Sequence, residues 1–131
     1  MDGQQKKVFW VEDDQALIDV YTCAINGIFD VEFIKIGQVA IDKIREIEQG
    51  KTKKPDLVVL DLELPDINGK VILEELKKTP ATKDIPVYIL TNYSEGKEQK
   101  KLTQELGAEK YLLKTDYPPS KLMPILKEKL K

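Results

Sequence analysis

The sequence predicts an α/β fold, a three-layer α/β/α sandwich in which five helices cover a five-stranded parallel sheet. Three observations lead to this prediction. Five short apolar runs alternate with stretches of helical periodicity. Successive runs are far enough apart for a crossover helix, which parallel strands require. One run, residues 57–60, is apolar at every position, as expected for a strand that is covered on both faces.

The first two strand–helix units are expected before residue 50. The apolar run 8–11 predicts a buried strand, and apolar residues spaced by three and four from Leu17 to Ile28 predict the helix that follows. A second strand is expected over 31–36. A second helical pattern runs from Ala40 to Ile47 and stops near Gly50.

The third unit places an acidic residue at the end of a buried strand. The strand expected over 57–60 is followed directly by Asp61. Residues 65–69, with Pro, Asp, Asn and Gly, have the chemistry of a turn, and a helix is expected from about 70 to 78.

The fourth unit begins at Pro86. The strand expected over 87–90 is followed by Thr91, and a helix is expected from about 95 to 106. Gly107 is suited to a left-handed C-terminal cap of that helix.

The fifth unit completes the sheet. A strand is expected over 111–113, directly before Lys114, and a helix over about 120–130. The length of 131 residues fits one domain, with its core over about 6–130 and no output domain.

Composition narrows the function classes. Apolar residues make up 41% and charged residues 34%, as in folded soluble proteins, and a net charge of -2 gives no attraction toward nucleic acid. Cys23 is the only Cys and His is absent, which excludes the usual zinc ligand sets. No apolar run approaches the length of a membrane span. We therefore expect a cytoplasmic protein without nucleic-acid or membrane partners.

Polar side chains converge at one edge of the predicted sheet. In doubly wound sheets of order 2-1-3-4-5, ligands bind beyond the carboxyl ends of strands 1 and 3, where Glu12, Asp13 and Asp61 are expected to meet. Three carboxylates repel one another unless a cation compensates them, and Mg²⁺ prefers oxygen ligands. Lys114 and Thr91 reach the same edge. A carboxylate nucleophile, a metal, an ammonium and a hydroxyl are the groups that phosphoryl transfer needs.

Several blocks of the sequence resemble response-regulator receiver domains of two-component signal transduction, of the stand-alone, chemotaxis-regulator-like kind with a flavodoxin-like fold. The blocks occur in the family's order across almost the whole chain. They are residues 11–14, Asp61 with 64–69, residues 85–87 leading to Thr91, residues 107–108, and Tyr111 with Lys114.

The resemblance implies roles for the acids and the lysine. Asp61 matches the phosphoacceptor and Lys114 the lysine that contacts the phosphoryl group. Asp13 matches a direct ligand of Mg²⁺ or Mn²⁺, Glu12 a ligand that acts through water, and the backbone carbonyl of Glu63 completes the protein's share of the metal shell.

The resemblance also implies a switch and partners. Thr91 and Tyr111 match the switch pair, whose hydroxyl moves toward the phosphoryl group while the aromatic ring turns inward. A sensor histidine kinase or phosphotransfer protein donates the phosphoryl group, and the domain catalyses only its own phosphorylation and dephosphorylation. A downstream protein docks on the fourth helix, fifth strand and fifth helix, around residues 97–101, Tyr111 and 120–127, and the chain is a monomer or a phosphorylation-dependent dimer.

Four residues depart from the family pattern or modulate the site. Thr115 replaces the Pro that usually follows the lysine in a cis peptide, and a non-proline cis bond costs about 2.5 to 4 kcal/mol. Asn92 stands where a small residue is usual, so its side chain narrows access to the acceptor. Our hypothesis is that Glu63 and Tyr93 slow hydrolysis of the aspartyl phosphate by hindering water.

Other interpretations remain open at this point. The acids at 12–14 are suited to capping the first helix, in which case Asp14 is only a cap. Thr91 is suited to capping a turn, Tyr111 to packing in a core, and Lys114 to a solvated position. Trp10 is expected in the core, close enough to the acids for its fluorescence to report metal binding.

Rival functions are separated by specific residues. A degenerate receiver would keep the fold as a phosphorylation-independent interaction module, which Thr115 and Asn92 favour. A phosphatase or phosphotransferase with an aspartyl-phosphate intermediate usually has a second Asp two residues after the nucleophile, where this chain has Glu63. A flavodoxin-like nucleotide binder would need a Gly-rich phosphate loop after the first strand, which is absent from the sequence.

Overall fold

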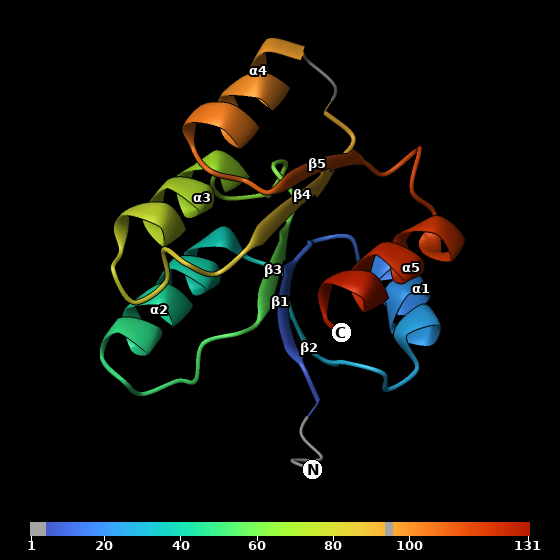
Figure 1. The fold of residues 1–131 in the computed structure, drawn as a ribbon, viewed down its shortest axis with the longest axis horizontal. Helices are drawn as coiled ribbons and strands as arrows, with labels where there is room; N and C mark the ends of the chain where they lie inside the picture. The colour runs from blue at the N-terminus through green and yellow to red at the C-terminus, as the bar shows by residue number, and fades with distance from the viewer. Residues whose placement is uncertain (1–4, 94–95) are drawn as a thin grey trace.

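The computed structural model describes residues 5–93 and 96–131 and forms a three-layer α/β/α sandwich. Its five parallel strands lie in the order β2-β1-β3-β4-β5, so the predicted fold class and strand order are confirmed. Helices α2, α3 and α4 cover one face of the sheet, and α1 and α5 the other (Figure 1). The elements are β1 (Lys7–Val11), α1 (Gln15–Ile25), β2 (Asp30–Ile34), α2 (Gly37–Glu48), β3 (Leu57–Leu60), α3 (Gly69–Lys78), β4 (Val87–Thr91), α4 (Gly96–Lys100), a π-helical turn η1 (Lys101–Glu105), β5 (Lys110–Leu113) and α5 (Pro119–Lys129).

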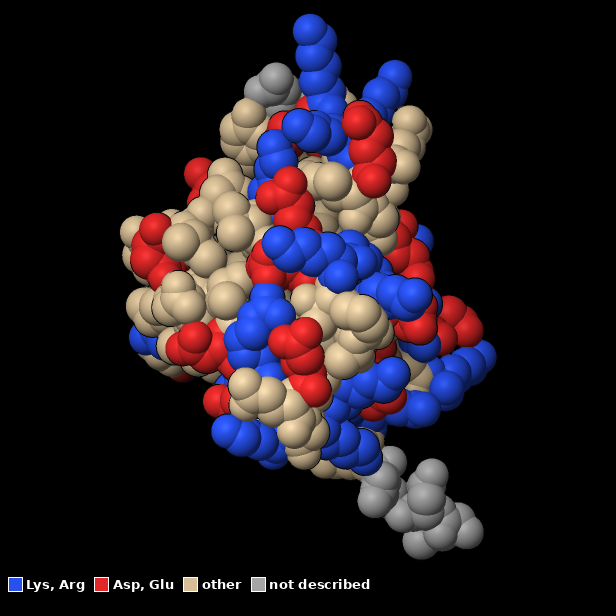
Figure 2. All heavy atoms as spheres, turned by 90° about the vertical axis from the view of Figure 1, so that its left-hand side faces the viewer, with Lys and Arg blue, Asp and Glu red and all other residues tan. Residues whose placement is uncertain are grey.

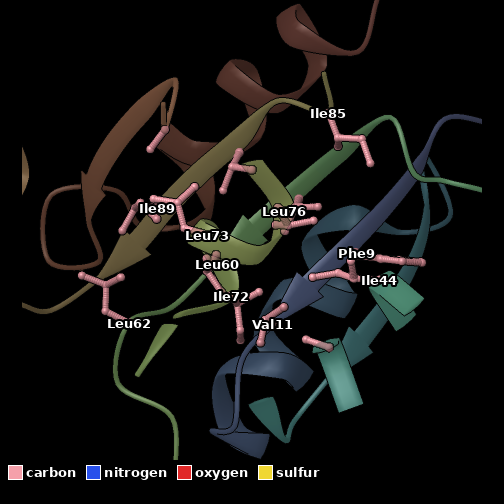
Figure 3. Close-up of a cluster of buried hydrophobic side chains, with 14 of the residues drawn as sticks. Phe9, Val11, Ile44, Leu60, Leu62, Ile72, Leu73, Leu76, Ile85 and Ile89 are labelled. Atoms are coloured by element: carbon pink, nitrogen blue, oxygen red, sulfur yellow. The ribbon is translucent and has the colours of Figure 1, made fainter. Parts of the chain in front are cut away.

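Each face of the sheet has its own apolar core, because successive strand residues point to opposite faces. Phe9 and Val11 of β1 pack toward α2 and α3, together with Leu60, Ile72 and other residues labelled in Figure 3. Trp10 of the same strand points to the other core, as expected. Its ring stacks on Tyr21 with centroids 4.6 Å apart.

Strand register brings the carboxyl ends together at one edge of the sheet. Val11 of β1 pairs with Ile34 of β2 and with Leu60 of β3. On the outer side, Thr91 of β4 pairs with Leu113 of β5. The residues that directly follow these strands therefore meet at the same edge.

The first helix is shorter than the apolar spacing predicts. It ends at Ile25 because Asn26 and Gly27 take left-handed conformations, with φ of 45° and 77°. Ile28 therefore lies outside the helix and is 44% exposed. The second strand likewise ends at Ile34, before the predicted end at residue 36.

The fourth helix also differs from its prediction. Its predicted start at residue 95 lies outside the described residues, and the described helix α4 changes at Lys101 into a π-helical turn. Within that turn the Leu106 amide donates to the Lys101 carbonyl, five residues back, at 3.0 Å. Gly107 follows with a φ of 87°, which agrees with the predicted left-handed cap.

Charges on the face formed by α2, α3 and α4 are interspersed, with basic and acidic side chains side by side (Figure 2). One such contact joins two helices, because Arg45 of α2 pairs with Glu75 of α3. In the described part of the chain, no helix has the length and apolar character needed to cross a bilayer.

Candidate functional site

Three acids meet where β1 and β3 end. Glu12 and Asp13 follow β1 and Asp61 follows β3, and one carboxylate oxygen from each lies within 4.8 Å of the other two. Glu12 is 0% exposed and Asp61 is 4% exposed, whereas Asp13 is less buried. The strand order thus brings together the three residues that the sequence singled out.

The backbone of both buried acids is fixed by the sheet. The Glu12 amide donates to the Ile34 carbonyl at 2.9 Å, and the Asp61 amide donates to the Val11 carbonyl at 3.1 Å. The parallel ladder therefore continues one residue beyond each strand. The side chains start from rigid backbone, which a site for metal or phosphoryl groups needs.

Asp14 is a helix cap, as one interpretation of the acidic run proposed. Its carboxylate accepts the amides of Ala16 at 2.9 Å and Leu17 at 3.3 Å, at the start of α1. Its own amide donates to Glu12 Oε2 at 3.1 Å. The cap of α1 and the orientation of Glu12 are therefore linked.

Lys114 connects two of the acids. It follows β5, and its Nζ lies 2.7 Å from Asp61 Oδ2 and 2.7 Å from Glu12 Oε1. Its side chain is only 11% exposed, so the alternative of a solvated lysine is wrong. Burial acts to lower the pKa of Lys114, but its contacts with Asp61 and Glu12 outweigh burial and raise that pKa.

The carboxylates fit a hard divalent cation. Burial raises the pKa of Glu12 despite the neighbouring ammonium. Glu12 Oε1 is fully buried, and the Lys114 ammonium 2.7 Å away is its charged neighbour. A site with three carboxylates and one ammonium retains negative charge, and its oxygen donors are of the kind that Mg²⁺ and Mn²⁺ prefer.

The predicted switch residues lie on β4 and β5. Thr91 is fully buried, and its Oγ1 accepts the Tyr93 amide at 3.3 Å, as the capping interpretation proposed. Tyr111 is 9% exposed and packs in the core on the face of the sheet covered by α2, α3 and α4 (Figure 1), as the packing interpretation proposed. Its hydroxyl donates to the Tyr93 carbonyl at 2.5 Å, and burial raises its pKa to about 12. The two residues are thus linked through the backbone of Tyr93.

Three residues predicted to modulate access lie on the loops that follow two neighbouring strands. Glu63 lies on the loop after β3, and Asn92 and Tyr93 follow β4. All three are exposed, Tyr93 to 40%. The Glu63 amide donates to Asp61 Oδ1 at 3.1 Å, so the backbone of this residue orients the acceptor while its side chain faces outward.

The turn after Lys114 is compact although it lacks the family's proline. The amides of Asp116 and Tyr117 donate to the Leu113 carbonyl at 3.0 and 3.1 Å. Every peptide bond in the described residues is trans, including the bond between Lys114 and Thr115.

Sequence reasoning missed the role of Asp66, which it treated only as a turn residue. The Asp66 carboxylate accepts the amides of Gly37 and Gln38, each at 2.8 Å, at the start of α2. One signal was present in the sequence. Ile36, which precedes α2, has no side-chain oxygen, so the helix needs a cap from elsewhere.

Comparison with known proteins identifies the family. Residues 8–127 match the model of the response regulator receiver domain, and the chain belongs to that family. The DNA-binding response regulator MtrA of Mycobacterium tuberculosis (strain ATCC 25618 / H37Rv) is 30% identical over 132 aligned residues, which cover 100% of this chain and 53% of MtrA. The chain thus spans about half the length of the curated relatives it matches.

Two solved receiver structures resemble the chain closely. The phosphorylated cyanobacterial phytochrome response regulator RcpA has a TM-score of 0.78 at 31% identity, with 95% of this chain and 90% of that chain covered. The Mn(2+)-bound form of response regulator Rcp1 has a TM-score of 0.75 at 27% identity, with 83% and 81% covered.

The chain is a receiver domain of the two-component response-regulator family, and this membership implies phosphorylation-based signalling. The family binds a divalent metal at an acidic pocket and works with histidine kinases and downstream effectors. The expectation of no nucleic-acid partner gains no support from the comparisons, because MtrA is named as DNA-binding.

Proposed function

We propose that this chain is a phosphorylation switch that accepts a phosphoryl group on Asp61 in a Mg²⁺-dependent reaction. A sensor histidine kinase or a phosphotransfer protein is the donor. One observation carries the proposal: the Asp61 carboxylate is buried, lies beside Glu12 and Asp13, and has the Lys114 ammonium 2.7 Å away. The phosphorylated state of RcpA and the Mn(2+)-bound state of Rcp1 support it as precedents.

Asp61 acts as the nucleophile. One of its oxygens bonds to phosphorus while the bond from phosphorus to the donor's imidazole nitrogen breaks, and that nitrogen keeps the electron pair. A bound Mg²⁺ or Mn²⁺ ion supplies positive charge for the oxygens of the group in transfer. Asp13, Asp61 and the Glu63 carbonyl would hold the ion directly, and Glu12 through water.

Lys114 and Thr91 supply the remaining polar groups. The Lys114 ammonium already contacts Asp61, so it needs only a small movement to pair with a phosphoryl oxygen. Thr91 would release the Tyr93 amide and turn its hydroxyl toward the phosphoryl group. Because Tyr111 donates to the carbonyl of the same Tyr93, a movement at Thr91 would reach the surface near β5.

The protein then acts by binding and not as an enzyme on a diffusible substrate. It would catalyse only its own phosphorylation and dephosphorylation, in the cytoplasm. The downstream partner would dock on the face of α4, β5 and α5, and phosphorylation would control this docking or the formation of a dimer.

Acetyl phosphate with Mg²⁺, followed by intact-protein mass spectrometry, tests the proposal. We expect a gain of one phosphoryl group on wild type and none on Asp61→Asn. Asp56→Asn is the matched control, because Asp56 directly precedes β3 whereas Asp61 directly follows it. Its labelling should equal that of wild type. A wild type that stays unlabelled after prolonged exposure would favour the degenerate receiver.

Metal binding has a separate readout. Trp10 is buried two residues before Glu12, so its fluorescence should respond when Mg²⁺ is added. We expect Asp13→Ala to abolish this response, with EDTA reversing it in wild type. An unchanged titration in Asp13→Ala would contradict the metal assignment.

A further inference from the structure

The loop that follows Asp61, residues 62–68, is held closed at its base. We call it the acceptor loop. The Gly69 amide donates to the Leu62 carbonyl at 2.8 Å, and Glu63 and Asn68 form an antiparallel bridge. The Asn68 side chain then caps α3 by accepting the Lys70 amide at 2.8 Å. Both ends of the loop are thus fixed, but its tip needs a further anchor.

Asp66 provides that anchor by capping a different helix. Its two carboxylate oxygens accept the amides of Gly37 and Gln38, 29 and 28 residues away in the sequence. The first amides of a helix have no partner within the helix, and a negative charge at that end is favourable. Since Ile36 makes no side-chain cap bond, the acceptor loop supplies the cap of α2.

Gly37 permits this contact. A Cβ at Gly37 would lie 2.3 Å from Ile67 Cγ1 and 3.0 Å from Asp66 Oδ1. The tip of the acceptor loop therefore packs directly on the backbone of α2. The φ of Gly37 is not in the left-handed range, so its backbone conformation does not require glycine. Glycine is needed here because a side chain would block the close approach of the acceptor loop.

The same loop orients the acceptor. The Glu63 amide donates to Asp61 Oδ1 at 3.1 Å, and the Glu63 carbonyl is a proposed metal ligand. At the loop's far end, a Cβ at Gly69 would lie 2.2 Å from the Asp61 carbonyl oxygen. A displacement of the loop would therefore move groups on both sides of Asp61.

We propose that Asp66 is a positioning residue of the phosphorylation site, which fixes the acceptor loop against α2 and thereby holds Glu63 in place beside Asp61. The inference rests on the proposed function, because the metal and the phosphoryl group are those of that function. Removing Asp66 takes away no metal ligand, yet it weakens Mg²⁺ binding and slows labelling. By reciprocity, Mg²⁺ binding at Asp61 tightens the contact with α2.

The experiment compares Asp66→Ala and Asp66→Asn with Asp56→Asn. Asp56 is a matched control, because it is also exposed and its carboxylate also accepts a backbone amide from a distant element. That amide is the one of Lys7, at 2.8 Å, and the contact lies at the opposite edge of the sheet. The first readout is the ¹H–¹⁵N resonance of Glu63 without metal. It should shift in both Asp66 variants and stay unchanged in Asp56→Asn.

The second readout is the Mg²⁺ dissociation constant from Trp10 fluorescence. We expect it to rise about tenfold in Asp66→Ala, the low end of the loss seen when groups that orient metal ligands are removed. Asp66→Asn should lose less, because one acceptor oxygen remains. In wild type, hydrogen exchange at Gly37 and Gln38 should slow when Mg²⁺ is added.

The outcomes separate this inference from the proposed function. An unchanged Glu63 resonance and Mg²⁺ constant in Asp66→Ala, with faster exchange at Gly37 and Gln38, would overturn it by showing that the cap acts only on α2. If wild type binds no Mg²⁺ and takes no phosphoryl group, the proposed function fails, and the metal-free shift of the Glu63 resonance still tests whether Asp66 positions Glu63.

If Asp66→Ala does not fold, Asp66→Asn alone decides. Equality of Asp66→Asn with wild type in both readouts, the Glu63 resonance and the Mg²⁺ dissociation constant, would then overturn the inference.

Discussion

The segments that follow β3 and β4 differ in how firmly they are held by the rest of the fold. The acceptor loop is tied at its base, to α3 and to α2, and α3 buries Ile72, Leu73 and Leu76. The segment after β4, here called the switch segment, comprises residues 92–93 and 96–105 among those described. Within it, α4 buries no side chain and η1 buries only Leu102.

This contrast suggests that the two segments have different functions. A metal site needs ligands that stay in place, and the acceptor loop meets that need. A segment with few buried apolar contacts opens at low free energy, so the switch segment is suited to move when the charge at Asp61 changes. The hydrogen bond from the Tyr111 hydroxyl to the Tyr93 carbonyl, at 2.5 Å, ties this segment to β5.

The largest effect on stability should come from adding one methyl group at the start of α3, after the acceptor loop, and at the start of α4, in the switch segment. Gly69 and Gly96 are the first residues of α3 and α4. A Cβ at Gly69 would lie 2.2 Å from the Asp61 carbonyl oxygen, whereas a Cβ at Gly96 would meet no atom of the described residues within 4 Å. We expect Gly69→Ala to lower the free energy of unfolding by about 3 kcal/mol. Gly96→Ala should raise it by about 0.5 kcal/mol.

Urea unfolding followed by Trp10 fluorescence measures both variants. Equal effects in the two variants would remove the contrast between the two segments.

A smaller effect is expected from cutting the tie of the switch segment. Tyr111→Phe keeps the ring in the core but removes the hydroxyl that donates to the Tyr93 carbonyl. The free energy of unfolding should fall by about 1 kcal/mol. Hydrogen exchange should rise at residues 92–93 and in α4, and stay unchanged at Gly69. Faster exchange across the acceptor loop would show that the two segments are not independent.

The contribution of Asp66 should depend on pH. Amide hydrogen bonds, that of Gln38 foremost, hold the pKa of Asp66 below its usual value of 3.8. A lowered folded-state pKa means that the ionised carboxylate stabilises the fold above the unfolded-state pKa, and that this stabilisation is lost as pH falls through the folded-state value. Wild type should therefore be more stable than Asp66→Asn at neutral pH, and the difference should shrink below about pH 4.

Urea titrations of both proteins from neutral pH to about pH 3 would measure this difference. A difference that grows on acidification would contradict the assignment of the ionised cap.

The smallest effect is expected on the lifetime of the aspartyl phosphate. Glu63 from the acceptor loop and Tyr93 from the switch segment both have exposed side chains, and they follow the neighbouring strands β3 and β4. If each hinders water, Glu63→Ala and Tyr93→Ala should each shorten the half-life by about twofold, which corresponds to about 0.4 kcal/mol of activation free energy. The decay of the labelled protein by mass spectrometry measures it. A wild-type half-life no longer than that of the variants would end the hypothesis.

The fold and the acidic site follow from local patterns. The apolar runs indicate the strands, and 2-1-3-4-5 is a common order for five strands in a doubly wound sheet. That order brings Glu12, Asp13 and Asp61 to one edge. Lys114 was expected at that edge, but its simultaneous contact with two acids depends on side-chain geometry that the pattern does not contain.

Other features depend on contacts that no local pattern encodes. The early end of α1 results from the left-handed pair Asn26 and Gly27, which outweighs the apolar spacing up to Ile28. Asp66 looks like an ordinary turn residue until the fold brings Gly37 beside it. The π-helical turn at Lys101 has no signal in the sequence that we recognise.

The reach of Lys114 has a consequence for the outermost strand. β5 forms the edge of the sheet and pairs only with β4 in the described structure. The Lys114 ammonium nevertheless extends past β4 to the acids that follow β3 and β1. The sheet's edge is thus fastened to its centre by electrostatic attraction at this end, and the strength of that attachment varies with the charge that Asp61 carries.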